Sequence, residues 1–270
     1  MEYLIACDLE GIHGVVGEPY KGLLTTIPDY QVAVTNAEKE INTVAKALFD
    51  CGATKVVLWD NHGGMVNVNQ ANIDSRVEHI DIEAIKRQAR YEFAKEHNFA
   101  GILYLGYHSR EGTLNGVLAH TYSSVDIQYV KINGKAVGEL EIDTYICAKY
   151  GIPPIFFASD DICVSQFKET VPNISSVVTK IAKGRNSADF IDEDKVLQDL
   201  YNGVCESVKK ENQIVSVDEP ISLEIRYTRT ERAAEKVKLA QQKRTPVKYG
   251  DDAHILLFEV DKIDDVTFFM

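Results

Sequence analysis

The chain has 270 residues, of which 45% are hydrophobic and 26% charged, and its formal net charge is -12 at pH 7. A chain of this size and composition can bury enough apolar surface for one large α/β domain, or for a large domain and a small one. The negative charge argues against nucleic acid and against an anionic membrane as partners, because both would repel the average surface.

Strand-like apolar runs alternate with amphipathic helical stretches, which predicts an α/β fold with a large, doubly wound and mostly parallel sheet. In the first part of the chain we expect, in order, a strand at 4–8, a helix at 29–50, strands at 55–59 and 76–80, a helix at 83–97 and a strand at 100–107. The last of these runs is almost continuously apolar, as in strands that are covered on both faces.

The middle of the chain changes character, because residues 126–132 alternate polar and apolar side chains and Asn133-Gly134 follows as a strong hairpin signal. An antiparallel hairpin excursion is therefore expected within 113–137. The α/β alternation then resumes with a helix at 138–150, strands at 155–158 and 177–179 and a helix at 193–210.

A polar stretch at 211–220 indicates a linker before a small C-terminal α/β unit. This unit is expected to contain a strand at 221–228, a helix at 230–241, a strand at 253–260 and a last helical turn or two. We therefore expect a large catalytic domain over residues 1–212 and a small α/β domain over 213–270, with the hairpin of 113–137 as a candidate to pack against the small domain.

The five cysteines are odd in number, show no C-x-x-C spacing and lie mostly in apolar segments. This pattern favours reduced thiols and a cytoplasmic location. Cys7 is expected to be a small core residue rather than a metal ligand. The apolar runs are far shorter than the roughly 18 residues of a membrane span.

Carboxylates follow the first predicted strand directly, at Asp8 and Glu10. Side chains two residues apart on a strand point to the same side, so these two can converge on one point. In an open parallel sheet the carboxyl edge of the strands is where ligands bind, and the first strand is normally central. A single D-x-E in this position is more often a turn or a helix cap, so it needs partners elsewhere.

Histidines supply those partners at the ends of three later apolar runs. His62 follows the strand at 55–59 within an Asp-Asn-His-Gly-Gly segment, His108 follows the strand at 100–107, and His120 follows an apolar stretch at 117–119. Carboxylate oxygen together with imidazole nitrogen suits a divalent transition metal such as zinc. The remaining histidines with no ligand-rich neighbours, which we interpret as structural, are His79, His97 and His254.

The order of five short segments resembles that of the zinc D-aminopeptidase family from residue 3 to the final strand. These segments are Asp8-Leu9-Glu10-Gly11, Asp60-Asn61-His62, Gly106-Tyr107-His108-Ser109-Arg110, His120 and Val137-Gly138-Glu139-Leu140. The resemblance implies two Zn²⁺ ions per subunit, held by Asp8, Glu10, His62, His108 and Glu139, with His120 as the catalytic histidine. It also implies a homodecamer whose inner channel admits short peptides.

Five ligands for two metals suggest a bridging carboxylate, and Asp8 on the central strand is the natural candidate. Glu10 and His62 would then complete one ion, and His108 and Glu139 the other. Two metals roughly 3.5–4 Å apart can share a hydroxide and polarise the scissile carbonyl. We therefore expect hydrolysis of the N-terminal amide bond of short peptides, with a preference for D-amino acids.

His120 has two possible roles in this scheme, as a donor to the oxyanion or as a proton shuttle to the leaving amine, and the sequence does not choose between them. Other functions remain open as well. A phosphoesterase or an amidase could use the same pair of metals, and a non-catalytic assembly protein could keep the metal for stability.

Other polar residues near the predicted strand ends have secondary roles in this interpretation. Asp160 and Asp161 immediately precede a predicted helix, and they are expected to cap it or to support the metal ligands from outside rather than to bind metal. Tyr107 and Arg110 flank His108 and are expected to orient it or to bind a substrate carboxylate. His13 is expected at the rim of the pocket.

Overall fold

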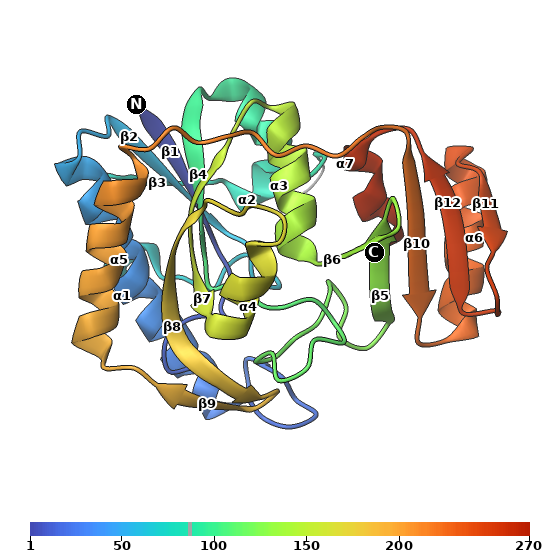
Figure 1. Cartoon of the computed structure of the whole chain (residues 1–270), viewed down its shortest axis with the longest axis horizontal. Coiled ribbons are helices and arrows are strands. Elements are labelled where there is room, and N and C mark those ends of the chain that lie inside the picture. The colour runs from blue at the N-terminus through green and yellow to red at the C-terminus, as the bar shows by residue number, and fades with distance from the viewer. Residues whose placement is uncertain (86–87) are drawn as a thin grey trace. The chain divides into compact units, whose positions relative to one another are not determined.

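A seven-stranded sheet organises the larger of two compact units in the computed structural model, which describes all residues except 86 and 87 (Figure 1). This unit contains Met1–Ser109, Leu114–Leu118 and Cys147–Val215. Its strands are β1 (Glu2–Cys7), β2 (Lys55–Asp60), β3 (Val77–His79), β4 (Phe99–Leu105), β7 (Pro154–Asp160), β8 (Ser175–Gly184) and β9 (Ser187–Phe190). They follow the order β3-β2-β1-β4-β7-β8-β9, and β9 alone of these pairs antiparallel to its neighbour.

Helices cover both faces of this sheet. On one face α1 (Pro28–Asp50) packs beside α5 (Glu193–Ser207), and the core there joins Leu200 and Val204 of α5 to Phe156 of β7. On the other face Phe167 of α4 (Asp161–Phe167) lies against Phe157, with ring centroids 5.2 Å apart. Since adjacent residues of β7 face opposite helices, the predicted doubly wound, mostly parallel sheet is confirmed.

The strand order places a topological switch point between β1 and β4. From β1 the sheet grows through β2 to β3, and from β4 it grows in the other direction through β7 to β8. The loops that leave the two central strands therefore diverge, and ligands of open α/β sheets bind in the crevice between such loops. Asp8 directly follows β1, and His108 lies three residues after the end of β4.

Gly106 allows these two central strand ends to approach each other closely. Its φ is +69°, and a Cβ atom built on it would lie 2.1 Å from the carbonyl oxygen of Asp8. The backbone N–H of Asp8 donates to the carbonyl of Leu105 at 2.8 Å, and that of Gly11 donates to the carbonyl of Gly106 at 2.6 Å. A side chain at position 106 would force the Asp8 segment away from β4.

Gly106→Ala is therefore expected to destabilise the protein far more than Gly52→Ala. Gly52 also has a positive φ, +91°, but a Cβ there meets nothing within 4 Å. The free energy of unfolding should fall by about 1 kcal/mol in the control, Gly52→Ala, from backbone strain alone. In Gly106→Ala it should fall by about 3 kcal/mol or more, because strain and overpacking add. Urea unfolding of the two variants measures the difference, and equal losses would show that the close approach has no energetic weight.

The smaller unit has an antiparallel sheet and contains Arg110–Thr113, Ala119–Ile146 and Ser216–Met270. Its strands, in the order β11-β12-β10-β5-β6, are β11 (Val247–Tyr249), β12 (Ile255–Val260), β10 (Ile221–Tyr227), β5 (Ile127–Ile132) and β6 (Lys135–Val137). The Asn133-Gly134 hairpin is confirmed, and both residues have positive φ as a tight turn of this kind requires. The hairpin joins the C-terminal segment through β5, which pairs with β10.

Helices complete the smaller unit. They are α6 (Thr230–Lys243), α7 (Ile263–Val266), the short η3 (Thr267–Phe269) and α3 (Glu139–Lys149), whose last three residues belong to the larger unit. Phe269 of η3 stacks on Phe258 of β12 with ring centroids 4.3 Å apart, and the hydroxyl of Tyr227 donates to the carbonyl of Phe269 at 2.7 Å. The last residues of the chain thus pack against the buried face of the sheet.

The prediction of one long helix at 83–97 was wrong for the described residues. The structure has a short helix α2 (Ile82–Ile85) and a 3-10 helix η2 (Glu92–Glu96), while residues 86 and 87 lie outside the described part. Tyr91 adopts a left-handed conformation with φ 62°, and its ring lies edge-on to Trp59 at 4.5 Å. Tertiary packing of this buried aromatic pair overrides the local helical pattern.

Several further elements were predicted too short or not at all. The strand expected at 177–179 extends over the whole of β8, and its antiparallel partner β9 was not predicted. The edge strand β11 and the short 3-10 helix η1 (Gln70–Asn72) were also not predicted. The strands β9 and β11, with four and three residues, are too short to show a period of two.

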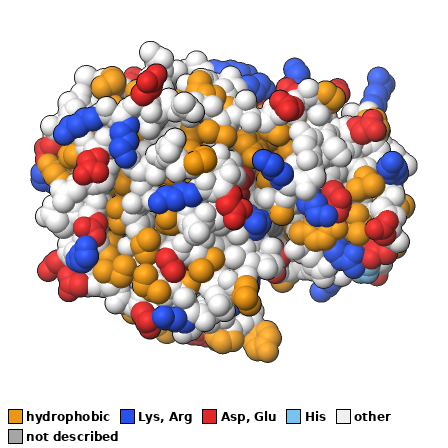
Figure 2. All heavy atoms as spheres, viewed as in Figure 1, with side chains coloured by type: hydrophobic (Ala, Val, Ile, Leu, Met, Phe, Trp, Pro, Cys, Tyr) orange, Lys and Arg blue, Asp and Glu red, His pale blue; other side chains and the backbone are white. Residues whose placement is uncertain are grey.

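Acidic and basic side chains are interspersed on the face of the molecule shown in Figure 2. Pairs of opposite charge form on the surface of each unit, such as Lys39 with Glu193 at 2.7 Å and Arg232 with Asp126 at 3.0 Å. Exposed pairs of this kind contribute at most about 1 kcal/mol each, so the buried cores carry most of the stability. Within the described residues, no helix has the length and apolar character needed to traverse a bilayer.

Candidate metal centre

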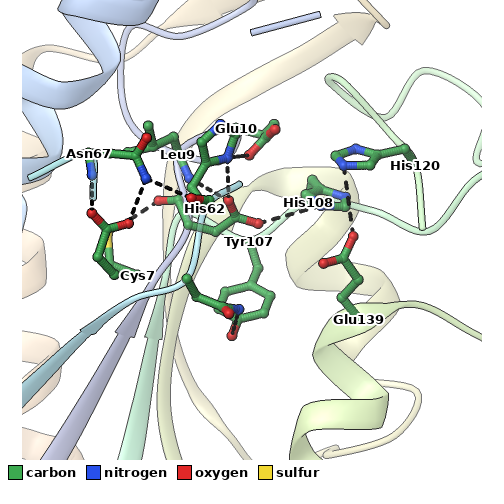
Figure 3. Close-up of polar contacts among 12 residues, drawn as sticks. Cys7, Leu9, Glu10, His62, Asn67, Tyr107, His108, His120 and Glu139 are labelled. Carbon is green, nitrogen blue, oxygen red and sulfur yellow. Dashed lines mark hydrogen bonds and ion pairs between the residues drawn. The ribbon is translucent and has the colours of Figure 1, made fainter. Parts of the chain in front are cut away.

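Two carboxylates and two imidazoles meet at the carboxyl edge of the larger sheet. Nδ1 of His62 lies 2.8 Å from Oδ1 of Asp8 and 3.1 Å from Oε2 of Glu10, and Nε2 of His108 lies 3.5 Å from Oδ2 of Asp8. Figure 3 shows Glu10 and His62 pointing toward each other. Asp8, Glu10 and His108 are buried. The larger unit therefore brings together four of the six residues that were expected in the site.

Burial and mutual interactions shift the pKa values within this group. Burial, followed by the neighbouring charge of Glu10, raises the pKa of Asp8 to about 7. Burial lowers the pKa of His62, but the charge of Glu10 and hydrogen bonds to Asp8 and Glu10 outweigh it and raise the pKa to about 12. Asp8, Glu10 and His108 each offer a ligand atom, all within 4.8 Å of one another. These oxygen and nitrogen donors fit a divalent transition metal.

The metal-free protein is expected to lose stability as the pH rises from about 5 to about 8. Burial raises the pKa of Glu40 to about 7, as it does that of Asp8. Both carboxyls thus bind a proton more tightly in the folded protein than in the unfolded chain, where their pKa is about 4, and the stability they contribute at low pH is lost as the pH passes 7.

Melting temperatures of EDTA-treated protein across this pH range measure the effect. Glu40→Gln should flatten the dependence of melting temperature on pH, because glutamine does not titrate. Glutamine keeps an oxygen that can accept the hydrogen bond from the backbone N–H of His13, which Glu40 accepts at 2.8 Å. A melting temperature that rises between pH 5 and 8 would contradict the prediction.

Asp60 shapes the loop that carries His62. Its carboxylate accepts hydrogen bonds from the backbone N–H groups of Asn67 at 2.6 Å and Val68 at 2.9 Å, and from the side-chain amide of Asn67 at 2.8 Å. That amide also donates to the carbonyl of His62 at 2.7 Å. Asp60 closes the loop and fixes the backbone from which His62 reaches Asp8.

Tyr107 connects the loop after β4 with the loop after β2. Its hydroxyl accepts a hydrogen bond from the side chain of Asn61 at 2.7 Å, and its carbonyl accepts one from the hydroxyl of Ser159 at 2.5 Å. Arg90 donates to Oδ1 of Asn61 at 3.0 Å and lies 4.8 Å above the ring of Trp59. These contacts give Tyr107 a supporting role between the segments that carry His62 and His108.

The smaller unit contains the other two expected residues, His120 and Glu139. Nε2 of His120 lies 3.8 Å from Oε1 of Glu139, as the dashed line in Figure 3 shows. Glu139 is the first residue of α3, and the same oxygen accepts the backbone N–H of Tyr122 at 2.6 Å. Tyr122 has a φ of +56°. The start of the helix thus holds both the carboxylate and the histidine loop in place.

The residues given secondary roles by the sequence have clear structural tasks. Asp160 caps α4 by accepting the N–H of Cys163 at 2.9 Å, which confirms the capping prediction for this residue. Asp161 is instead the first residue of α4, and its Oδ1 accepts the backbone N–H of Ala182 at 2.7 Å. Cys7 is part of the apolar core that faces α1 and α5. Nε2 of His13 lies 2.7 Å from the carbonyl of Ile191, which ties the loop after β1 to the segment after β9.

Sequence reasoning missed Thr179 and Lys180 of β8. Both side chains are buried and donate hydrogen bonds to the backbone of the loop after β1. Burial lowers the pKa of Lys180 to about 8, against the opposing charges of Asp160 and Glu40. The only signal in the sequence was a lysine within an otherwise apolar run, and lysines there are usually solvated.

Comparisons with known proteins identify the family of this chain. A model of the D-aminopeptidase family, M55 among the peptidases, matches residues 1–249. A D-aminopeptidase of Bacillus subtilis (strain 168) is 24% identical over 220 residues, which cover 82% of this chain and 78% of that protein.

The solved structure of DppA, a Zn-dependent D-aminopeptidase from Bacillus subtilis described as a self-compartmentalizing protease, has the same fold. It matches with a TM-score of 0.86 at 21% identity, over 100% of this chain and 95% of the other. The family match, in contrast, rests on the sequence itself, and its range of 1–249 contains the positions of all six residues expected in the site. This protein is therefore a peptidase of the D-aminopeptidase family, as the order of its motifs predicted.

Proposed function

We propose that the protein is a zinc-dependent aminopeptidase that releases the N-terminal residue of short peptides and prefers D-amino acids. The observation that carries this proposal is the group of Asp8, Glu10, His62 and His108 at the switch point of the sheet, in which all but His62 are buried, in a chain that belongs to the D-aminopeptidase family. The zinc dependence of the Bacillus subtilis relative supports the choice of metal.

Two Zn²⁺ ions per subunit are proposed, with Asp8, Glu10, His62, His108 and Glu139 as ligands. The two oxygens of Asp8 support a bridging role, because Oδ1 faces His62 and Oδ2 faces His108. In this scheme Glu10 and His62 would hold one ion, and His108 and Glu139 would hold the other. When bound, zinc supplies a water of lowered pKa and polarises the scissile carbonyl.

The protein's own groups position the reactants and move the proton. Burial of Asp8 and Glu10 keeps bulk water away from their carboxylates, which strengthens their interaction with a cation. His120 is proposed to act with Nε2 protonated, whether it donates to the oxyanion or to the leaving amine. Nε2 of His120 lies 3.8 Å from Oε1 of Glu139, a carboxylate of the same unit.

We further propose that the protein forms a homo-oligomer, a decamer, that encloses its active sites and works in the cytoplasm. The self-compartmentalizing relative supports the enclosure, and the odd number of cysteines, without C-x-x-C spacing, fits a reducing compartment. Light scattering on the eluting peak of a sizing column gives the number of copies. A monomeric, fully active protein would contradict this part of the proposal.

The activity is tested with matched D- and L-aminoacyl amides and dipeptides on zinc-loaded protein, with a phosphate ester as a further substrate. We expect cleavage of the N-terminal amide, with D-substrates faster by roughly 10-fold or more, since one wrongly placed substituent costs about 1–3 kcal/mol in the transition state. Equal rates for both enantiomers would remove the D-preference. Hydrolysis of the phosphate ester alone, or no hydrolysis at all, would contradict the proposed aminopeptidase activity.

A further inference from the structure

Two buried side chains of β8 hold three successive backbone carbonyls of the loop after β1. Nζ of Lys180 donates to the carbonyl oxygens of Glu10 at 2.6 Å and Ile12 at 2.8 Å, and Oγ1 of Thr179 donates to that of Gly11 at 2.7 Å. Both side chains are fully buried. The segment that carries Glu10 is thus fixed through its backbone by a strand 170 residues farther along the chain.

A bulge in β8 explains why two adjacent side chains reach the same loop. In the pairing with β7, Ser159 lies opposite Val178 and Asp160 opposite Lys180, so Thr179 is an extra residue in the register. Successive side chains of a regular strand point to opposite faces. An inserted residue re-aims the side chains around it, and such bulges are frequent beside active sites.

Two side chains of α1 hold the far end of the same loop. Oε1 of Glu40 accepts the backbone N–H of His13 at 2.8 Å, and the side-chain amide of Asn36 donates to the carbonyl of His13 at 3.0 Å. Together we call Asn36, Glu40, Thr179 and Lys180 the loop cradle. The cradle contacts the backbone of every residue from 10 to 13, so this loop has a single well-defined path.

Burying the ammonium group of Lys180 in β8 is energetically costly. Removing an ammonium group from water costs several kcal/mol, and a well-packed apolar side chain of similar volume is often at least as stabilising. The carboxylates around Lys180 do not remove this cost completely, because Oδ2 of Asp160 and Oε2 of Glu40 are buried without a hydrogen-bond partner among the described residues. Stability alone therefore does not explain Lys180.

We propose that Lys180 is a positioning residue for metal binding. By fixing the carbonyls on both sides of Gly11, it holds the side chain of Glu10 in the orientation that meets His62 at 3.1 Å. This inference rests on the proposed function, in which Glu10 is a zinc ligand. Groups that orient a ligand from outside typically change metal affinity by about 10–100-fold when they are removed.

Lys180→Met tests the proposal, since methionine keeps an unbranched apolar side chain but has no N–H donor. Zinc affinity, measured by competition with a chromophoric chelator, should weaken by about 10–100-fold. kcat should fall while KM changes little, because the substrate pocket itself is intact. Thr179→Val, which is nearly isosteric and removes one donor, should shift zinc affinity in the same direction by a smaller factor.

Leu200→Ala is the control for a purely structural effect. Leu200 is fully buried in α5 and belongs to the core that faces α1, so its truncation should cost about 2–5 kcal/mol of stability without removing any hydrogen bond of the cradle. Its zinc affinity should equal that of the wild type. If Lys180→Met and Thr179→Val also keep wild-type zinc affinity and merely melt at lower temperature, the proposal is overturned.

Hydrogen exchange of the metal-free proteins separates this inference from the proposed function. The amides of residues 10–13 should exchange faster in Lys180→Met than in Leu200→Ala at matched global stability. A wild-type protein that binds no zinc would refute the zinc peptidase, yet the exchange rates would still show whether Lys180 orders the loop. Unchanged exchange at these amides would refute the positioning role.

Discussion

Asp8→Asn is expected to lower kcat/KM for a D-aminoacyl amide by about a thousand-fold or more, because the proposed bridge between two zinc ions loses its charge and one of its ligand oxygens. The variant keeps the size of the side chain and an oxygen for the N–H of Leu9, which Asp8 accepts at 2.9 Å. The fold should therefore survive. Zinc content, measured on the same sample by atomic absorption, should drop together with activity.

Asp74→Asn is the matched control for this substitution. Asp74 also lies in the larger unit and its carboxylate is bound by Arg76 at 2.6 Å, but it offers no ligand atom to the group around Asp8. Its activity and zinc content should remain at wild-type levels. An Asp8→Asn protein with full zinc content and undiminished activity would show that Asp8 is not a ligand.

His120→Ala is expected to lower kcat by about 10²- to 10⁴-fold, the range in which a positioned proton donor contributes to catalysis. Zinc should still bind, since His120 is not among the proposed ligands. The control is His254→Ala, in the same unit, where the ring nitrogen lies 3.1 Å from the carbonyl of Tyr227 and serves the small sheet. Full activity in His120→Ala would remove its catalytic role and leave the metal site standing.

The sequence predicts the framework of the larger unit well because its signals are local. The strand before Asp8 is a buried apolar run and α1 has a clear helical period, and both are present with boundaries shifted by a few residues. The region 83–97 failed because Tyr91 is placed by its contact with Trp59, far away in the sequence. Hydrophobic periodicity contains no information about a packing partner that is distant in the sequence.

In the candidate site, too, some residues follow from local sequence signals and others do not. Asp8, Glu10, His62 and His108 follow apolar strands, and parallel strands bring their carboxyl ends to one edge, so their approach follows from position alone. Glu139 had no such signal, because it is the first residue of a helix and resembles any favourable carboxylate there. Only the order of motifs in a family singled it out.

Lys180 shows what a single sequence cannot reveal. Its function depends on a bulge, which is defined only by the pairing of β8 with β7, and on carbonyls 168 and 170 residues away. Neither hydropathy nor charge distinguishes it from an exposed strand lysine. Residues that act through the backbone of a ligand are visible only once the hydrogen bonds of that ligand's segment are known.

Titration of metal-free protein with zinc, followed by hydrolysis of a D-aminoacyl amide at each step, tests the central claim most directly. A zinc-dependent aminopeptidase with a two-ion site should be inactive without metal and should reach full activity when about two equivalents per chain have bound. Full activity in EDTA-treated protein, or zinc binding that never produces amide hydrolysis, would contradict the account.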